Sequence, residues 1–97
     1  MRTFAAHQAK HAFHGITVVV ETDGAELYVG RCDDIDERGV HLRDADLHDR
    51  ANPALSRREF LASARAVGVW PNLKRVTVPA GRVRSVERLV AVAEKPS

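Results

Sequence analysis

Three histidines near the start of the chain have the spacing of a possible metal site. His7, His11 and His14 lie four and three positions apart, so a helix would project all three to one side. Two histidines at this spacing can ligate zinc, and a third could complete a facial site. No carboxylate on the same predicted helix would support them. The sequence therefore favours a solvated stripe, with no metal and no other cofactor.

Four acidic residues cluster in one short segment: Asp33, Asp34, Asp36 and Glu37. Their oxygen atoms could bind a hard cation, but the spacing and the glycine of a calcium-binding EF-hand loop are absent. The sequence favours a solvated loop in which Asp36 accepts backbone N–H bonds ahead of Gly39.

No residue lies in a recognisable catalytic motif. The neighbours of Cys32 are Asp33 and Asp34, whose charges should raise the pKa of its thiol and disfavour a nucleophilic thiolate. The serines lie outside nucleophile motifs, and the six glycines are scattered singly, so no phosphate-binding loop is present. We therefore expect a protein that is not an enzyme.

The basic residues concentrate in the second half of the chain. The net charge is +2, but residues 1–49 carry about −5 and residues 50–97 about +7. This asymmetry indicates an anionic partner or charge-matched self-association. Charges that simply mix on a solvated exterior would give the same counts. The basic set comprises Arg57, Arg58, Arg65, Lys74, Arg75, Arg82, Arg84 and Arg88.

An Asp-Gly pair between two alternating runs predicts the first hairpin. Asp23-Gly24 separates the apolar-rich runs 16–22 and 25–33. A two-residue Asp-Gly link suits a type I′ turn, which needs φ > 0 at both central residues. Gly30 inside the second run indicates a sharp bend or a close backbone approach.

Capping signals predict helices at the start of the chain and in the connector after the third strand. Thr3 and Gly15 bound the first helix, and Ser56 with Glu59 forms a capping box for the second. Trp70 is expected to pack this second helix onto the strands. The expected elements are a helix at 3–13, a three-strand meander at 16–44 (strands 16–22, 25–33 and 39–44), an insertion at 45–72 with a helix near 56–67, a final strand pair at 73–89 (strands 73–79 and 82–89) and a tail at 90–97.

Length and composition favour a single, mainly β domain over residues 1–97. The layout predicts a five-stranded, strongly bent small barrel with an N-terminal helix and a helical insertion between the third and fourth strands. No run approaches the roughly 18 apolar residues of a membrane helix, so no membrane partner is expected. Polar residues between positions 7 and 11 interrupt any signal-peptide core. The lone Cys32 cannot form an internal disulfide, which fits a reducing cytoplasm.

This order of elements resembles the Sm-like (LSm) family of small β-barrels. The family's first motif places a Gly in a bent second strand and an Asp six positions later, as Gly30 and Asp36 do here. Its second motif, a short turn between two apolar strands, is matched in part by residues 76–83. The motifs cover roughly half the chain. The residues that carry the resemblance are Asp23, Gly24, Leu27, Gly30, Cys32, Asp36 and Leu42, with Val76 to Val83.

Membership would imply a closed homo-oligomeric ring in which the fourth strand of one subunit pairs with the fifth strand of the next. Elementary physics supports such a ring, because an open five-stranded sheet leaves two edges with unpaired backbone groups. The expected apolar contacts across this junction join Leu73, Val76 and Val78 to Val83, Val86 and Leu89.

The resemblance also implies RNA as a partner, although the residues depart from the family's base-reading pocket. The loop at 37–40 has no Asn, and Ala80 stands where the family commonly has Arg beside its Gly. RNA would then bind mainly through phosphates, with strong salt dependence. The expected nucleic-acid-binding residues are Asp36, Arg38, Gly39, Gly81, Arg82 and Arg84.

Two alternatives stay open. The first is an oligomeric protein-interaction module of the same fold without nucleic-acid binding, favoured by the absent base pocket and the divided charge. The second is a different small barrel, such as the PRC-barrel type, which would have another strand order and no ring.

Overall fold

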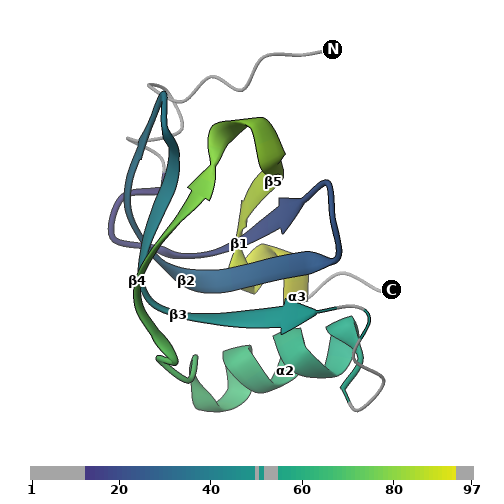
Figure 1. The fold of residues 1–97 in the computed structure, drawn as a ribbon. Coiled ribbons are helices and arrows are strands. Elements are labelled where there is room, and N and C mark those ends of the chain that lie inside the picture. The colour runs from purple at the N-terminus through teal and green to yellow at the C-terminus, as the bar shows by residue number, and fades with distance from the viewer. Residues whose placement is uncertain (1–12, 50, 52–54, 94–97) are drawn as a thin grey trace.

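A computed structural model describes residues 13–49, 51 and 55–93 (Figure 1). The predicted helix at 3–13 falls almost wholly outside these residues, as do His7 and His11. The described elements are β1 (Thr17–Thr22), β2 (Glu26–Asp36), β3 (Gly39–Asp49), α2 (Arg57–Val67), β4 (Leu73–Pro79), the 3-10 turn η1 (Ala80–Arg82), β5 (Val83–Arg88) and α3 (Leu89–Ala93).

The five strands form one antiparallel sheet in the order β4-β3-β2-β1-β5. The predicted mainly β, five-stranded architecture is therefore present. The sheet does not close into a barrel, because β4 pairs only with β3 and β5 only with β1 among the described strands. Pro79 ends the edge strand β4, where it interrupts no internal ladder.

The bend that Gly30 indicates lies where β2 and β3 lose their regular register. Val29 pairs with Asp46 but Arg31 pairs with Arg43, so β3 contains one extra residue in this stretch. Asp44, at φ 50°, lies in this bulge. A Cβ added to Gly30 would lie 2.6 Å from the Cβ of Ala45, which confirms the predicted close approach.

Two hydrophobic cores lie on opposite faces of the sheet, and β1 contributes to both. Val18 and Val20 belong to the first core, whereas Val19 between them belongs to the second. All three are at most 1% exposed. The first core holds Val18, Val20, Cys32, Ile35, Val40, Leu42, Ala45, Val78 and Val86. The second holds Val19, Leu27, Val29, Phe60, Leu61, Ala64, Leu89 and Val92.

Helices α2 and α3 supply their apolar faces to the second core (Figure 1). Ser56 and Glu59 form the reciprocal capping box that their spacing predicts, with N–H to side-chain distances of 3.1 Å in both directions. Arg57 contacts Glu21 of β1 at 2.6 Å, and the ring of Phe60 packs on His48 of β3. Trp70 does not pack the helix onto the sheet as expected, since it is 69% exposed.

The first turn also differs from its prediction. Residues 23–25 link β1 to β2, and neither Asp23 nor Gly24 has a positive φ, so the turn is not type I′. The hydroxyl of Thr22 determines the turn instead. It donates to the carbonyl oxygen of Glu26 at 2.7 Å and accepts from the N–H of Gly24 at 3.2 Å.

Two further boundaries shift because tertiary contacts outweigh local sequence signals. The predicted insertion starts at 45, but β3 continues to Asp49 because Asp46 and His48 pair with Val29 and Leu27 of β2. The predicted last strand is present as β5, but it ends at Arg88, and α3 replaces the start of the predicted tail, since Leu89 and Val92 pack together into the second core. The described helices include none with the length and apolar character needed to cross a membrane.

Replacing Gly30 by Ala should destabilise the fold by about 1–3 kcal/mol, because the new methyl group has no space against Ala45. Gly81→Ala is the matched control: nothing lies within 4 Å of an added Cβ there, so a change below about 0.5 kcal/mol is expected. Chemical denaturation measures both, and Gly30→Ala combined with Ala45→Gly should recover part of the loss. A Gly30→Ala protein as stable as the original would contradict this account of the bend.

Candidate functional site

The turn between β2 and β3 and the η1 turn, from which the sequence predicted RNA contacts, lie side by side. The N–H of Ala80 donates to the carbonyl oxygen of Arg38 at 2.9 Å, and Gly39 pairs with Pro79. Gly39 has φ 145° and is buried, and an added Cβ would collide with the carbonyl oxygen of Val78. Glycine is therefore required at 39 for the β2–β3 turn to fit against β4.

Asp36 is the centre of a chain of hydrogen bonds across three strands. Its Oδ1 accepts from the N–H of Arg38 and from Nε2 of His41, both at 2.9 Å. Nδ1 of His41 lies 2.8 Å from the hydroxyl of Thr77 on β4. The bond from His41 is the main reason that the pKa of Asp36 is lowered, with backbone N–H bonds from Arg38 and Gly39 adding to it. The predicted turn-capping role of Asp36 is confirmed.

The three residue types joined by these hydrogen bonds, Asp, His and Thr, also occur in catalytic triads, where an oriented imidazole activates a hydroxyl. Such chemistry further requires donors aimed at the developing oxyanion. Beside Thr77 the structure has two guanidinium groups, those of Arg43 and Arg75, which donate hydrogen bonds and carry positive charge. This combination suits holding an anion, and the fixed ring of His41 ties β2, β3 and β4 together.

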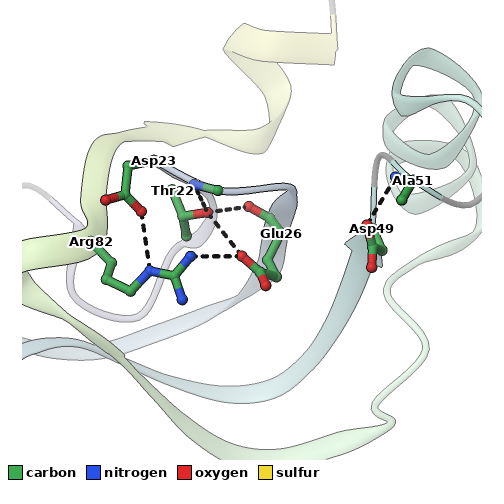
Figure 2. A network of polar contacts seen from close by, with 7 residues as sticks. Thr22, Asp23, Glu26, Asp49, Ala51 and Arg82 are labelled. Carbon is green, nitrogen blue, oxygen red and sulfur yellow. Dashed lines mark hydrogen bonds and ion pairs between the residues drawn. The ribbon is translucent and has the colours of Figure 1, made fainter.

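Arg82, expected to contact phosphate, is committed to two carboxylates (Figure 2). Its Nε lies 3.1 Å from Oδ1 of Asp23, and a terminal nitrogen lies 2.9 Å from Oε1 of Glu26. These contacts raise the pKa of Arg82, with the hydrogen bond to Asp23 contributing most. The carbonyl of Arg82 also accepts from the N–H of Asp23 at 3.0 Å. Arg82 thus fastens the η1 turn to the β1–β2 turn, and phosphate would have to displace both acids.

Of the other expected nucleic-acid-binding residues, Arg38, Gly81 and Arg84 are accessible, whereas Gly39 is buried. Arg38, in the β2–β3 turn, and Arg84, on β5, are exposed. Gly81 is exposed in η1, with open space where a side chain would lie. Only Arg38 and Arg84 therefore keep the predicted capacity to meet phosphates.

The histidine and acidic clusters do not form a metal site within the described residues. His14 bonds through Nδ1 to the carbonyl oxygen of Asp33 at 2.7 Å, and its predicted partners His7 and His11 lie outside the described part of the chain. The acids also have other contacts: Asp33 pairs with Arg43 at 3.4 Å, and Asp34 accepts from the N–H of Ile35 at 2.9 Å. They belong mostly to β2 and not to a solvated loop.

Cys32 is fully buried in the first core. Its pKa is raised to about 11, first by burial and then by the charges of Asp34 and Asp33. The predicted direction is correct, but the sequence alone pointed to the acids and missed the larger effect of burial. Neither accessibility nor charge suits this thiol to nucleophilic chemistry.

A hollow that sequence reasoning missed lies over the outer face of β2, β3 and β4. We call it the outer hollow; its volume is about 310 Å³. Its charged walls come from three strands, of which β4 follows β2 and β3 only after α2, so only the strand register reveals the hollow. The lining residues are Asp33, Asp34, His41, Leu42, Arg43, Arg75, Val76 and Thr77.

Replacing His41 by Phe should raise the carboxyl pKa of Asp36 towards its ordinary value, because the largest lowering contact is lost. The carboxyl should stay somewhat below that value, since the backbone N–H bonds remain. Thr77→Val is the control, because it removes only the contact on the far ring nitrogen. NMR titration of the Asp36 carboxyl carbon measures both variants.

The sign of the accompanying pH effect follows from the lowered pKa. The stability contributed by the ionised Asp36 carboxylate is fully present above its unfolded pKa of about 3.9. This contribution is lost as the pH falls through the lower pKa of Asp36 in the folded protein. An Asp36 pKa that His41→Phe leaves unchanged would contradict the assigned contact.

Comparison with known proteins adds no family assignment. Neither the family models nor the curated proteins with which the sequence was compared match it. The geometry of the described residues is therefore the basis for any functional conclusion.

Proposed function

We propose that this chain is a ring-forming, Sm-like β domain that assembles through its two outer strands and binds RNA through phosphates. The observation that carries the proposal is the open sheet. Its outer edges, on β4 and β5, have no strand partner among the described residues. An unpaired edge exposes a row of backbone N–H and C=O groups that can template pairing with another chain. Pairing β4 of one copy with β5 of the next would satisfy both rows.

Apolar side chains at both edges suit this junction. Leu73 and Val76 on β4 and Val83 on β5 are each half-buried, and they pack against the first core. A neighbouring copy would extend that core across the junction and cover the remaining apolar surface. Leu89, expected in this contact, begins α3 and belongs to the second core instead.

Charge at the same edges works against close approach. Lys74 and Arg75 lie on β4, Arg84 and Arg88 lie on β5, and Glu87 is the one acidic residue of the two strands. Like charges brought together across the junction repel, and salt screens that repulsion. Assembly should therefore strengthen with ionic strength, whereas phosphate binding should weaken.

For the RNA part of the proposal, Arg38 and Arg84 supply exposed guanidinium groups, with Arg82 held away by its carboxylates. Contacts of this kind bind phosphate without reading the base. Filter binding to oligouridylate and oligoadenylate at two salt concentrations tests it. Similar, salt-sensitive binding to both is expected, and no binding at low salt would remove RNA from the proposal.

The second candidate function is a protein-interaction module of the same fold. The observation that favours it is an exposed apolar surface at the end of α2, where Val67 is 75% and Trp70 is 69% exposed. Contiguous apolar patches mark interaction surfaces, and Val67 and Trp70 would be the anchors of one here. Protein partners captured equally well after nuclease treatment, together with absent RNA binding, would favour this candidate.

The assembly is tested by light scattering on the purified chain at several salt concentrations. A mass that is a fixed multiple of 10.7 kDa is expected, and the fraction of the protein with this mass should increase with salt. Val76→Asp should reduce it to one chain, because the charge interrupts the apolar junction. Val67→Asp, an exposed apolar position on α2, is the control and should leave the multiple intact. Circular dichroism verifies that each variant is folded, and a single-chain mass for the unaltered protein under all conditions would contradict the ring.

A further inference from the structure

Three arginines lie in a straight row across the sheet. Arg31 of β2 is the cross-strand partner of Arg43 of β3, which is in turn the partner of Arg75 of β4. Side chains at directly opposite positions share one face of a sheet. All three side chains are exposed. We call these residues the arginine row, and it borders the outer hollow through Arg43 and Arg75.

Nothing within the described fold explains the row as a stabilising feature. Like charges directly opposite one another destabilise neighbouring strands. Arg31 and Arg75 have no hydrogen-bond or ion-pair partner among the described residues. Arg43 has one, Asp33, at 3.4 Å from its Nε, which leaves its terminal nitrogens available. The row therefore presents guanidinium groups that the described part of the fold leaves largely uncompensated, and an external anion would satisfy them.

We propose that the arginine row binds the phosphates of a single-stranded nucleic acid laid across β2, β3 and β4. A guanidinium is a planar fork that matches phosphate oxygens in pairs. Adjacent strands are about 4.8 Å apart, so the row spans about 10 Å. A compact anion reaches one or two of these forks, whereas a chain of phosphates reaches all three. A flexible single strand can follow such a row on a sheet surface, as in other single-strand grooves.

The acids of the outer hollow determine where phosphate would lie. Asp33 and Asp34 line the hollow and would repel an anion that entered it. Phosphates therefore bind above the hollow, on the terminal nitrogens of the row. Because no base pocket is involved, binding does not depend on base identity. This site is distinct from the loop residues Arg38 and Arg84, and it does not require assembly into a ring.

Fluorescence anisotropy with a short labelled oligouridylate and its DNA counterpart tests the proposal on the full chain. Three phosphate contacts to a single strand give a slope of log K against log salt of about −2, so a fourfold rise in salt should weaken binding roughly twentyfold. Arg31→Gln, Arg43→Gln and Arg75→Gln should each reduce the magnitude of this slope by about 0.7. Arg58→Gln, an exposed arginine on α2, is the matched control and should change nothing.

Asp33→Asn gives the opposite expectation, because it frees Arg43 and removes a repelling charge. Its protein should bind the oligonucleotide more tightly. Thermal unfolding should show the Arg31→Gln and Arg75→Gln variants to be no less stable than the original, since each removes like-charge repulsion without breaking an ion pair; Arg43→Gln also loses the contact with Asp33 and is not part of this comparison. A row that only served the fold would produce destabilised variants with unchanged binding.

Three results would overturn the proposal: oligonucleotide binding unaffected by the row variants, no binding by the unaltered chain, or competition by pyrophosphate as strong as by the oligonucleotide. If Arg38→Gln with Arg84→Gln abolishes binding while the row variants do not, the loop site is correct and the row is wrong. Light scattering on the same samples reports assembly separately, so loss of the ring and loss of the row are distinguishable.

Discussion

The close contact between Gly30 of β2 and Ala45 of β3 is the constraint on which the shape of the sheet depends. With no Cβ at 30, the two longest strands approach closely where β3 accommodates an extra residue at Asp44. Bulges bend and twist strands, and this one divides β2 and β3 into two segments. One segment packs beneath α2 in the second core, and the other carries the outer face with its arginines and its hollow. Gly30 thus lies at the boundary between the part of β2 and β3 that α2 covers and the part whose outer face is exposed.

Features with a local physical cause were predictable from the sequence. The capping box of Ser56 and Glu59, the bend at Gly30 and the N–H bond accepted by Asp36 involve residues close together in the chain, whose types leave few conformations open. The alternating apolar runs likewise predicted five strands. Local reasoning was wrong at the first turn, where the hydroxyl of Thr22 replaces the expected type I′ geometry. It was also wrong at Leu89, where packing in the second core favours helix over strand.

The candidate sites were much less predictable, because they depend on strand register. His41 is unremarkable in the sequence, yet the pairing of β3 with its neighbours places it between Asp36 and Thr77. The three arginines of the row are separated by long stretches of chain, and only the cross-strand partners bring them into line. The reverse holds for Arg82: its position in a turn suggested a phosphate contact, but Asp23 and Glu26 occupy it. Residue type indicates what a side chain can bind, whereas the fold decides whether it is available.

The open edges of β4 and β5 connect this fold to its proposed role, since backbone groups without partners favour pairing with a further copy. Residue-resolved hydrogen exchange tests this claim most directly. The informative amides are those of β4 and β5 that do not bond to β3 or β1. If copies pair edge to edge, these amides should be protected at high protein concentration to an extent similar to the β1–β2 ladder, and dilution should remove that protection. Outer-edge amides that exchange as fast as those of the turns, at every concentration and in a folded chain, would contradict the account.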